Sequence, residues 1–155
     1  MKRILKNILL FAGLCLTLAG CNKYTLFTDA FVAFDVDTSS ATTVDASGSW
    51  TGVYYIDYTG ETQKETLTVT FSIKTGDGLT EGIDYEIITK GRTLTFLPGI
   101  FSLPIRIKWL PSPLDASKDN SLTITLETSS DPKTALGHPG PDSLNKSITI
   151  YKITN

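Results

Sequence analysis

The sequence predicts an all-β fold, an antiparallel β-sandwich of about seven strands, over most of its 155 residues. Three observations lead to this prediction. Apolar and polar residues alternate with a period of two, which places one face of a strand in a core and the other in water. Clusters of Gly, Pro, Asp and Ser separate the alternating segments at short intervals. After the first twenty residues no stretch has the periodicity and capping residues of a helix, so strands at this spacing favour a sandwich.

Residues 66–74 show the clearest alternation, with Leu, Val, Phe and Ile at every second position. A similar pattern ends at Trp109, which is therefore predicted to lie in the core or at its edge. The segment from Asp37 to Gly52 is rich in Ser, Thr, Ala and Gly and is predicted to be a loop. The predicted strands are 31–36, 53–58, 66–74, 83–88, 92–97, 102–109, 122–126 and 147–153.

The first twenty residues have the character of a secretory signal peptide. Lys2, Arg3 and Lys6 form a short basic region, and an uncharged segment from Ile8 to Ala19 follows it. A helix of this length extends about 18 Å at ~1.5 Å per residue, which is too short for a bilayer core of roughly 30 Å. We therefore expect this segment to be removed from the mature protein.

The signal peptide ends in Leu18-Ala19-Gly20-Cys21, which resembles the lipobox of bacterial lipoproteins. Small residues admit a peptidase, and a cysteine thiolate is the nucleophile that takes the diacylglycerol. The resemblance implies thioether lipidation of Cys21, cleavage before it and acylation of the new amino terminus. An ordinary secretory peptide with a chance cysteine is the alternative. We expect a signal peptide over 1–20, a lipidated cysteine and tether over 21–29 and one β-sandwich over 30–155.

The expected mature chain has 135 residues, which is the size of a single domain. It contains 11 basic and 16 acidic residues, a net charge of −5, and lacks the basic stripe of a nucleic-acid-binding protein. Of the two cysteines, Cys15 leaves with the signal peptide and Cys21 takes the lipid. Disulfides, thiolate metal sites and cysteine nucleophiles are therefore excluded from the mature domain.

Several motifs follow one another in the order of a known domain family. Gly82-Ile83-Asp84-Tyr85 comes first, and Leu94-Thr95-Phe96-Leu97-Pro98-Gly99 and alternating strands follow it. These motifs resemble Calx-β domains over roughly residues 30–152, and the resemblance implies an immunoglobulin-like sandwich. Together with the lipobox, they also resemble small lipoproteins of Bacteroidetes. Such lipoproteins often accompany glycan-uptake systems in the outer membrane.

The motif residues also have structural roles that follow from their own chemistry. Gly82 permits a backbone turn that would strain other residues. Tyr85 shares a strand face with Ile83 and Ile87, so we expect it in the core with its hydroxyl hydrogen-bonded. Pro98-Gly99 predicts a tight turn between strands 92–97 and 102–109.

Calcium is the cofactor that the resemblance raises, because some Calx-β domains bind it through carboxylates at one end of the sandwich. Calcium takes six to eight oxygen ligands. This chain departs from the family pattern at Ile100, where an acidic residue often follows Pro-Gly, and at 110–114, which replaces an acidic loop. Solvated loop carboxylates are the alternative to a metal site. The candidate ligands are Asp35, Asp37, Asp84, Asp115 and Asp119.

A glycan-binding surface needs exposed aromatic rings with polar neighbours. Trp50 lies in the polar loop before a strand in which Tyr54 and Tyr58 share one face and Tyr55 occupies the other. We take Trp50, Tyr54 and Tyr58 as candidate ligand-binding residues. The alternative for Trp50 is a lid packed over one end of the sandwich, which the usual burial of aromatic residues favours.

Signals of catalysis are weak. The single histidine, His138, lies in a Gly/Pro loop, and the sequence has no Gly-x-Ser-x-Gly elbow. We therefore expect a non-enzymatic, lipid-anchored binding or scaffolding module whose partner is a glycan or another envelope protein. A calcium-dependent structural or adhesion module is the alternative.

Two further expectations concern placement and pairing. The residues after Cys21 lack the aspartate that favours inner-membrane retention in some bacteria, so the outer membrane is expected, on either face. Strand 147–153 is a candidate sheet edge through which two copies could pair. Lys146 and Lys152 disfavour such pairing, because lysines commonly protect edges.

Overall fold

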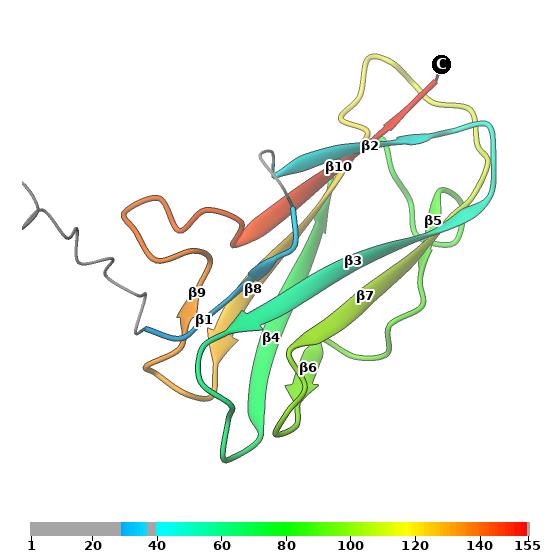
Figure 1. Cartoon of the computed structure of the whole chain (residues 1–155). Coiled ribbons are helices and arrows are strands. Elements are labelled where there is room, and N and C mark those ends of the chain that lie inside the picture. Colours follow the sequence, from blue (N-terminus) through cyan, green and yellow to red (C-terminus); the bar gives the residue numbers. More distant parts are fainter. Residues whose placement is uncertain (1–28, 37–39, 155) are drawn as a thin grey trace, which may run out of the picture.

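The computed structural model describes residues 29–36 and 40–154, which form an all-β sandwich (Figure 1). The predicted signal peptide, Cys21 and Asp37 lie outside the described residues. The described part contains no helix that is long and apolar enough to cross a membrane. Its strands are β1 (Phe31–Phe34), β2 (Ala41–Asp45), β3 (Trp50–Thr59), β4 (Leu67–Thr75), β5 (Tyr85–Ile87), β6 (Thr93–Phe96), β7 (Ser102–Trp109), β8 (Ser121–Ser129), β9 (Ala135–Leu136) and β10 (Ser147–Ile153).

Two five-stranded sheets make up the sandwich. The first sheet has the order β5-β7-β3-β1-β9, and the second has the order β2-β10-β8-β4-β6. Neighbouring strands are antiparallel except in the pairs β1–β9 and β10–β2, which are parallel. The predicted all-β sandwich is confirmed, and the described residues form ten strands where the sequence predicts about seven.

The extra strands are short and contribute little to the core. β2 lies inside the segment that the sequence assigns to a loop, and Val44 is its one buried apolar residue. A strand with a single buried side chain has no alternation for a sequence pattern to show. β9 has two residues and pairs with the start of β1. Both strands therefore form because they pair with a neighbouring strand in the folded domain, and not because of a pattern in their own sequence.

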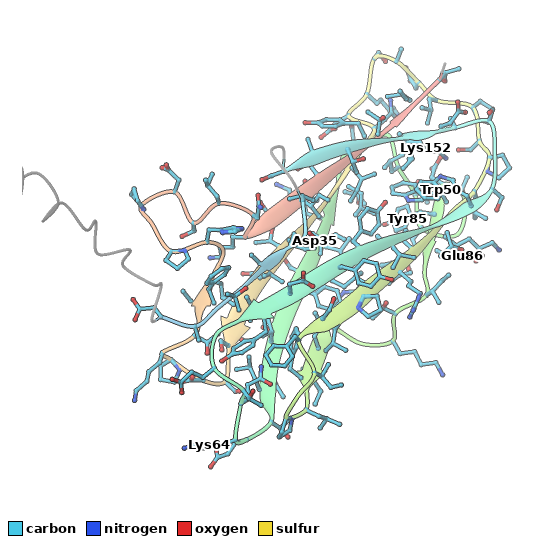
Figure 2. All side chains as sticks on the ribbon, viewed as in Figure 1. Asp35, Trp50, Lys64, Tyr85, Glu86 and Lys152 are labelled. Atoms are coloured by element: carbon cyan, nitrogen blue, oxygen red, sulfur yellow. The ribbon has the colours of Figure 1, made fainter. Side chains whose placement is uncertain are left out.

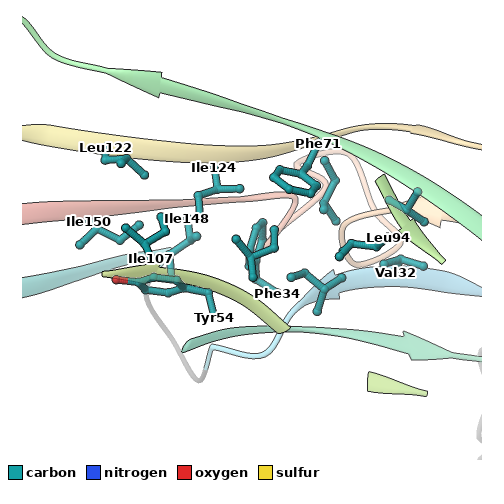
Figure 3. Packing of buried hydrophobic residues seen from close by; sticks show 14 of the residues in the cluster. Val32, Phe34, Tyr54, Phe71, Leu94, Ile107, Leu122, Ile124, Ile148 and Ile150 are labelled. Atoms are coloured by element: carbon teal, nitrogen blue, oxygen red, sulfur yellow. The ribbon is translucent and has the colours of Figure 1, made fainter. Parts of the chain in front are cut away.

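The core is built from the inward faces of both sheets, whose side chains meet in Figure 3. Trp109 is fully buried, which confirms its predicted place. Tyr85 is buried too, with its ring centroid 6.1 Å from that of Trp109. Ile83, however, is exposed, because it lies in the turn before β5 and does not share the strand face of Tyr85.

The predicted Pro98-Gly99 turn is present. The Ile100 N–H donates to the Leu97 carbonyl at 2.9 Å, and Gly99 has a φ of 85°. A positive φ at the third residue and proline at the second define a type II turn, in which glycine avoids a steric penalty. The turn links β6 of the second sheet to β7 of the first, so it crosses between the layers rather than closing a hairpin.

The prediction that strand 147–153 is a sheet edge is wrong. β10 lies inside the second sheet, between β2 and β8. Its inward positions are Ile148, Ile150 and Lys152, all of them buried. Lys152 therefore faces the interior instead of protecting an edge, and β2 covers the side of β10 that the sequence leaves open.

A tyrosine and a tryptophan are joined by a hydrogen bond inside the core. The indole Nε1 of Trp109 donates to the Tyr54 hydroxyl at 3.0 Å. Burial raises the pKa of Tyr54 to about 12, although the hydrogen bond from Trp109 opposes the rise. The Tyr54 ring lies over Gly52, where an added Cβ would stand 2.6 Å from the tyrosine hydroxyl oxygen. Glycine at position 52 thus gives the ring its space.

We expect Gly52→Ala to lower the free energy of unfolding by about 1–3 kcal/mol, because the new methyl group must displace the Tyr54 ring in a packed core. Urea denaturation measures the change. Gly48→Ala is the matched control, since its Cβ would meet no atom within 4 Å. Equal stability of the two variants would contradict the packing argument.

Candidate functional site

One end of the sandwich is held together around a buried lysine, labelled Lys152 in Figure 2. Its Nζ donates to the Asp84 carboxylate oxygen Oδ1 at 3.0 Å and to the Asp84 carbonyl at 3.3 Å. A third hydrogen bond goes to the Ser112 hydroxyl, which in turn donates to Asp84 Oδ1. An ammonium group has three N–H donors, and all three find acceptors here.

The Asp84 carboxylate is fully engaged as well. Its second oxygen, Oδ2, accepts the Thr80 N–H at 2.8 Å. Burial by itself would raise the pKa of Asp84. The hydrogen bonds from Ser112, Thr80 and Lys152, with the lysine charge, outweigh burial and hold the pKa below its ordinary value. Asp84 is therefore an ionised partner of a buried cation.

The four predicted calcium ligands that the structure describes, Asp35, Asp84, Asp115 and Asp119, do not gather into one site. Asp84 pairs with Lys152, whereas Asp115 is bonded to the hydroxyl and N–H of Ser117 in an exposed loop. Asp119 accepts the Ser121 N–H, and Asp35 follows β1 along the side of the sandwich. Within residues 29–36 and 40–154, no three His, Cys, Asp or Glu side chains are placed to hold a metal ion.

The predicted aromatic surface needs a correction. Trp50 is 46 % exposed, but Tyr54 and Tyr58 are each only 8 % exposed and point into the core. The exposed tyrosine of β3 is Tyr55, at 47 %. Alternation shows that Tyr54 and Tyr55 lie on opposite faces, but it does not say which face is inward. Gly52, on the face of Tyr54, is the sequence signal that could have indicated the buried side.

A groove opens along the side of the sandwich because β1 is short. β7 pairs with β3 from Trp50 to Asp57, but β1 pairs only with the last four residues of β3. Beyond Phe34, the chain makes one further backbone hydrogen bond to β3, from the Asp35 N–H to the Tyr55 carbonyl at 3.0 Å. The edge of β3 before Tyr55 is thus left without a paired strand among the described residues.

We call this opening the side groove, and it has a volume of about 250 Å³. It runs between the two sheets, and Figure 2 labels Asp35 and Trp50, two of the residues that line it. Aromatic rings supply flat apolar surface, while a carboxylate and a hydroxyl supply hydrogen-bonding groups. Its walls include Phe34, Asp35, Thr42, Trp50, Tyr54 and Tyr55.

Trp50 lies at the start of a strand and not in the predicted loop. It begins β3 opposite Trp109 of β7, yet its side chain is exposed rather than packed as a lid. Trp50 also lines the side groove together with Tyr54, which was likewise predicted to bind ligand and whose ring forms part of the groove wall on the core side. Tyr58 lies at the other end of β3, where its hydroxyl donates to the Glu61 carbonyl at 3.0 Å.

Comparison with known proteins supports the fold. No family model and no curated protein matches the chain. Among solved structures, the crystal structure of CBD12 from CALX1.2, a Calx-β protein, matches with a TM-score of 0.50 and 14 % identity. The match covers 81 % of this chain but only 44 % of that structure, so this chain spans less than half its length. At this identity the likeness shows the Calx-β-like sandwich fold alone.

We expect Lys152→Met to lower the free energy of unfolding by about 3–5 kcal/mol, because removing one partner leaves the buried Asp84 charge uncompensated. Urea denaturation gives the measurement. Lys108→Met is the control, since Lys108 pairs with Glu86 at 3.4 Å in solvent. Such exposed pairs contribute about 0–1 kcal/mol, so similar losses in both variants would contradict a special role for Lys152.

Calcium should leave the domain unchanged, because the Asp84 oxygens are already occupied by Lys152, Ser112 and Thr80. We expect thermal unfolding midpoints in millimolar calcium and in chelator to agree within about 1 °C, well below the shift that a kcal/mol of ligand stabilisation produces. Magnesium at equal ionic strength is the control. A rise of several degrees with calcium alone would support a metal site.

Proposed function

We propose that this chain is a lipid-anchored envelope protein whose sandwich binds an extended glycan in the side groove without catalysing a reaction on it. One observation carries the binding proposal: Trp50 and Tyr55 are exposed beside a groove that also contains Asp35 and Thr42. Small-molecule sites combine apolar and aromatic walls with a few polar groups that orient the ligand.

The shape of the groove favours an elongated ligand. Trp50 and Tyr55 are five residues apart along β3, a distance of about 16 Å at ~3.3 Å per residue. The odd spacing directs the two side chains to opposite faces of β3, so a glycan that contacts both rings would cross the edge of the strand, with each ring packed against the apolar face of a sugar ring. The Asp35 carboxylate and Thr42 hydroxyl are then available for sugar hydroxyl groups.

The composition of the groove supports binding rather than hydrolysis. Glycosidases use two carboxyl groups, commonly about 5–9.5 Å apart, on either side of the bond that breaks. Asp35 is the one carboxylate among the described residues that line the groove. Among the described residues, the groove therefore combines one carboxylate with two exposed aromatic rings, a composition suited to holding a glycan.

The anchoring part of the proposal rests on the residues from Leu18 to Cys21. Lipid on Cys21 would keep the domain at the outer membrane, since stable anchoring requires about two acyl chains and a processed lipoprotein carries three. The described sandwich begins at β1, a short distance along the chain from Cys21. A binding domain held in this way could retain glycans close to the membrane or support other proteins that process them.

Affinity electrophoresis of the chain from residue 22 onward, in gels that contain xylan, mannan, starch or β-glucan, tests the binding proposal. We expect at least one polysaccharide to retard migration. Trp50→Ala and Tyr55→Ala should each weaken that interaction by about tenfold or more, which corresponds to ~1.4 kcal/mol, since truncated aromatic anchors are among the costliest interface changes.

Tyr151→Ala is the matched control. Tyr151 has the same 47 % exposure as Tyr55 but lies on β10 in the second sheet and is not among the residues of the groove. Its loss should leave migration unchanged. Equal effects of the Tyr55 and Tyr151 substitutions, or unretarded migration in every gel, would count against glycan binding in the side groove.

A further inference from the structure

The end of the sandwich opposite Lys152 carries an exposed apolar turn. Its sequence is Leu97-Pro98-Gly99-Ile100-Phe101, five successive residues without a charge or a polar side chain. Leu97 is 54 % exposed, Ile100 40 % and Phe101 41 %. Three large apolar side chains exposed in a single turn form the kind of surface that marks an interaction site.

The backbone holds these side chains in place. The type II turn fixes Leu97 to Ile100, and the Phe101 carbonyl accepts the Tyr58 N–H at 2.8 Å. The Phe101 ring also lies 6.1 Å from the Tyr58 ring, measured between centroids. The turn thus presents a defined apolar surface at the end of the sheet.

The chain enters the domain at the same end. In the first sheet, Val32 of β1 pairs with Tyr58 of β3. Tyr58 in turn donates its backbone N–H to the carbonyl of Phe101, the residue that precedes β7. β1 and the chain that leads into β7 lie on either side of β3, about 10 Å apart at ~4.8 Å per strand spacing. β1 therefore begins beside the apolar turn.

We propose that this end, which we call the anchor end, rests on the lipid bilayer with Leu97, Ile100 and Phe101 in contact with the interface. The inference rests on the proposed lipidation of Cys21. Residues 22–29 can extend at most about 28 Å at ~3.5 Å per residue, which keeps the turn within reach of the surface. The acyl chains hold the protein at the bilayer, and this raises the effective concentration of the turn at the membrane surface. Contact between the turn and the surface then sets the orientation of the protein.

The charges of the anchor end favour an apolar contact over an electrostatic one. Lys64 and Lys133 are accompanied there by Glu61, Glu65 and Asp131. A mixed set of this kind gives no net attraction to anionic lipid. Burial of the apolar turn would therefore drive the contact, and a zwitterionic bilayer suffices as the partner.

Such an orientation would place the side groove toward the aqueous side. Figure 2 shows Trp50 and Lys152 at one end of the sandwich and Lys64 at the other. Trp50 and Thr59 are nine residues apart on β3, about 30 Å at ~3.3 Å per residue. The Trp50 end of the groove would then stand well clear of the lipid headgroups and remain accessible to a long glycan.

A fluorescent probe on the lipidated full-length protein tests the orientation. Because Cys15 is removed with the signal peptide and the Cys21 sulfur is alkylated, Ile100→Cys provides a single thiol for an environment-sensitive dye. In phosphatidylcholine vesicles we expect a blue shift of its emission. Nitroxide-bearing lipids should quench it by roughly half, because interfacial side chains lie about 5–10 Å into the headgroup region.

Ala116→Cys is the matched control, since Ala116 is exposed in the loop between β7 and β8 at the Lys152 end. Its dye should remain in water and unquenched. Mass spectrometry of Cys21 separates the two proposals: a chain without lipid overturns the anchor and, with it, this inference. A lipidated, vesicle-bound chain with equal dye responses at positions 100 and 116 overturns the orientation alone. Shielding of position 100 in native envelopes but not in pure lipid would assign the turn to a protein partner.

Discussion

The ammonium group of Lys152 constrains this domain more than any other single group. A buried charge without partners is costly, so the chain must bring acceptors to it from elsewhere. They come from Asp84 before β5 and from Ser112 after β7, which places two loops against the end of β10. The Leu110 N–H donates to the Asp84 carbonyl at 3.0 Å, and the Ser112 N–H to the Ala46 carbonyl at 3.2 Å, so the same contacts close this end of both sheets.

This closed end contrasts with the rest of the molecule. Along the side, β1 stops at Phe34 and the groove opens between the sheets. At the anchor end, an apolar turn projects from the junction of β6 and β7. The sandwich therefore has one end closed around a buried ion pair, an aromatic side and a second end that presents an exposed apolar turn. The proposed glycan binding uses the aromatic side, the proposed membrane contact uses the apolar turn, and the Lys152 cluster joins the loops at the remaining end.

The outcome at Asp84 illustrates how a resemblance and a structure can differ. Its place in the motif predicts a calcium ligand, and its oxygens are indeed directed at a cation. That cation is a lysine side chain of the same protein, whose position on β10 continues the inward face of Ile148 and Ile150. The alternation thus indicated that Lys152 shares the inward face of Ile148 and Ile150. A lysine at this position also fits an edge strand, however, and the local pattern cannot distinguish an inward-facing lysine from one that protects an edge.

The sequence by itself determined the all-β class, the buried position of Trp109 and the turn at Pro98-Gly99, because alternation and turn chemistry act between near neighbours. The tertiary structure decided that Tyr54 points inward and Tyr55 outward, that β10 is an interior strand and that Asp84 meets Lys152. These features depend on strand order and on contacts between distant segments, such as the 68 residues that separate Asp84 from Lys152. A period of two defines the faces of a strand, whereas only the packing of one sheet on another decides which face is buried.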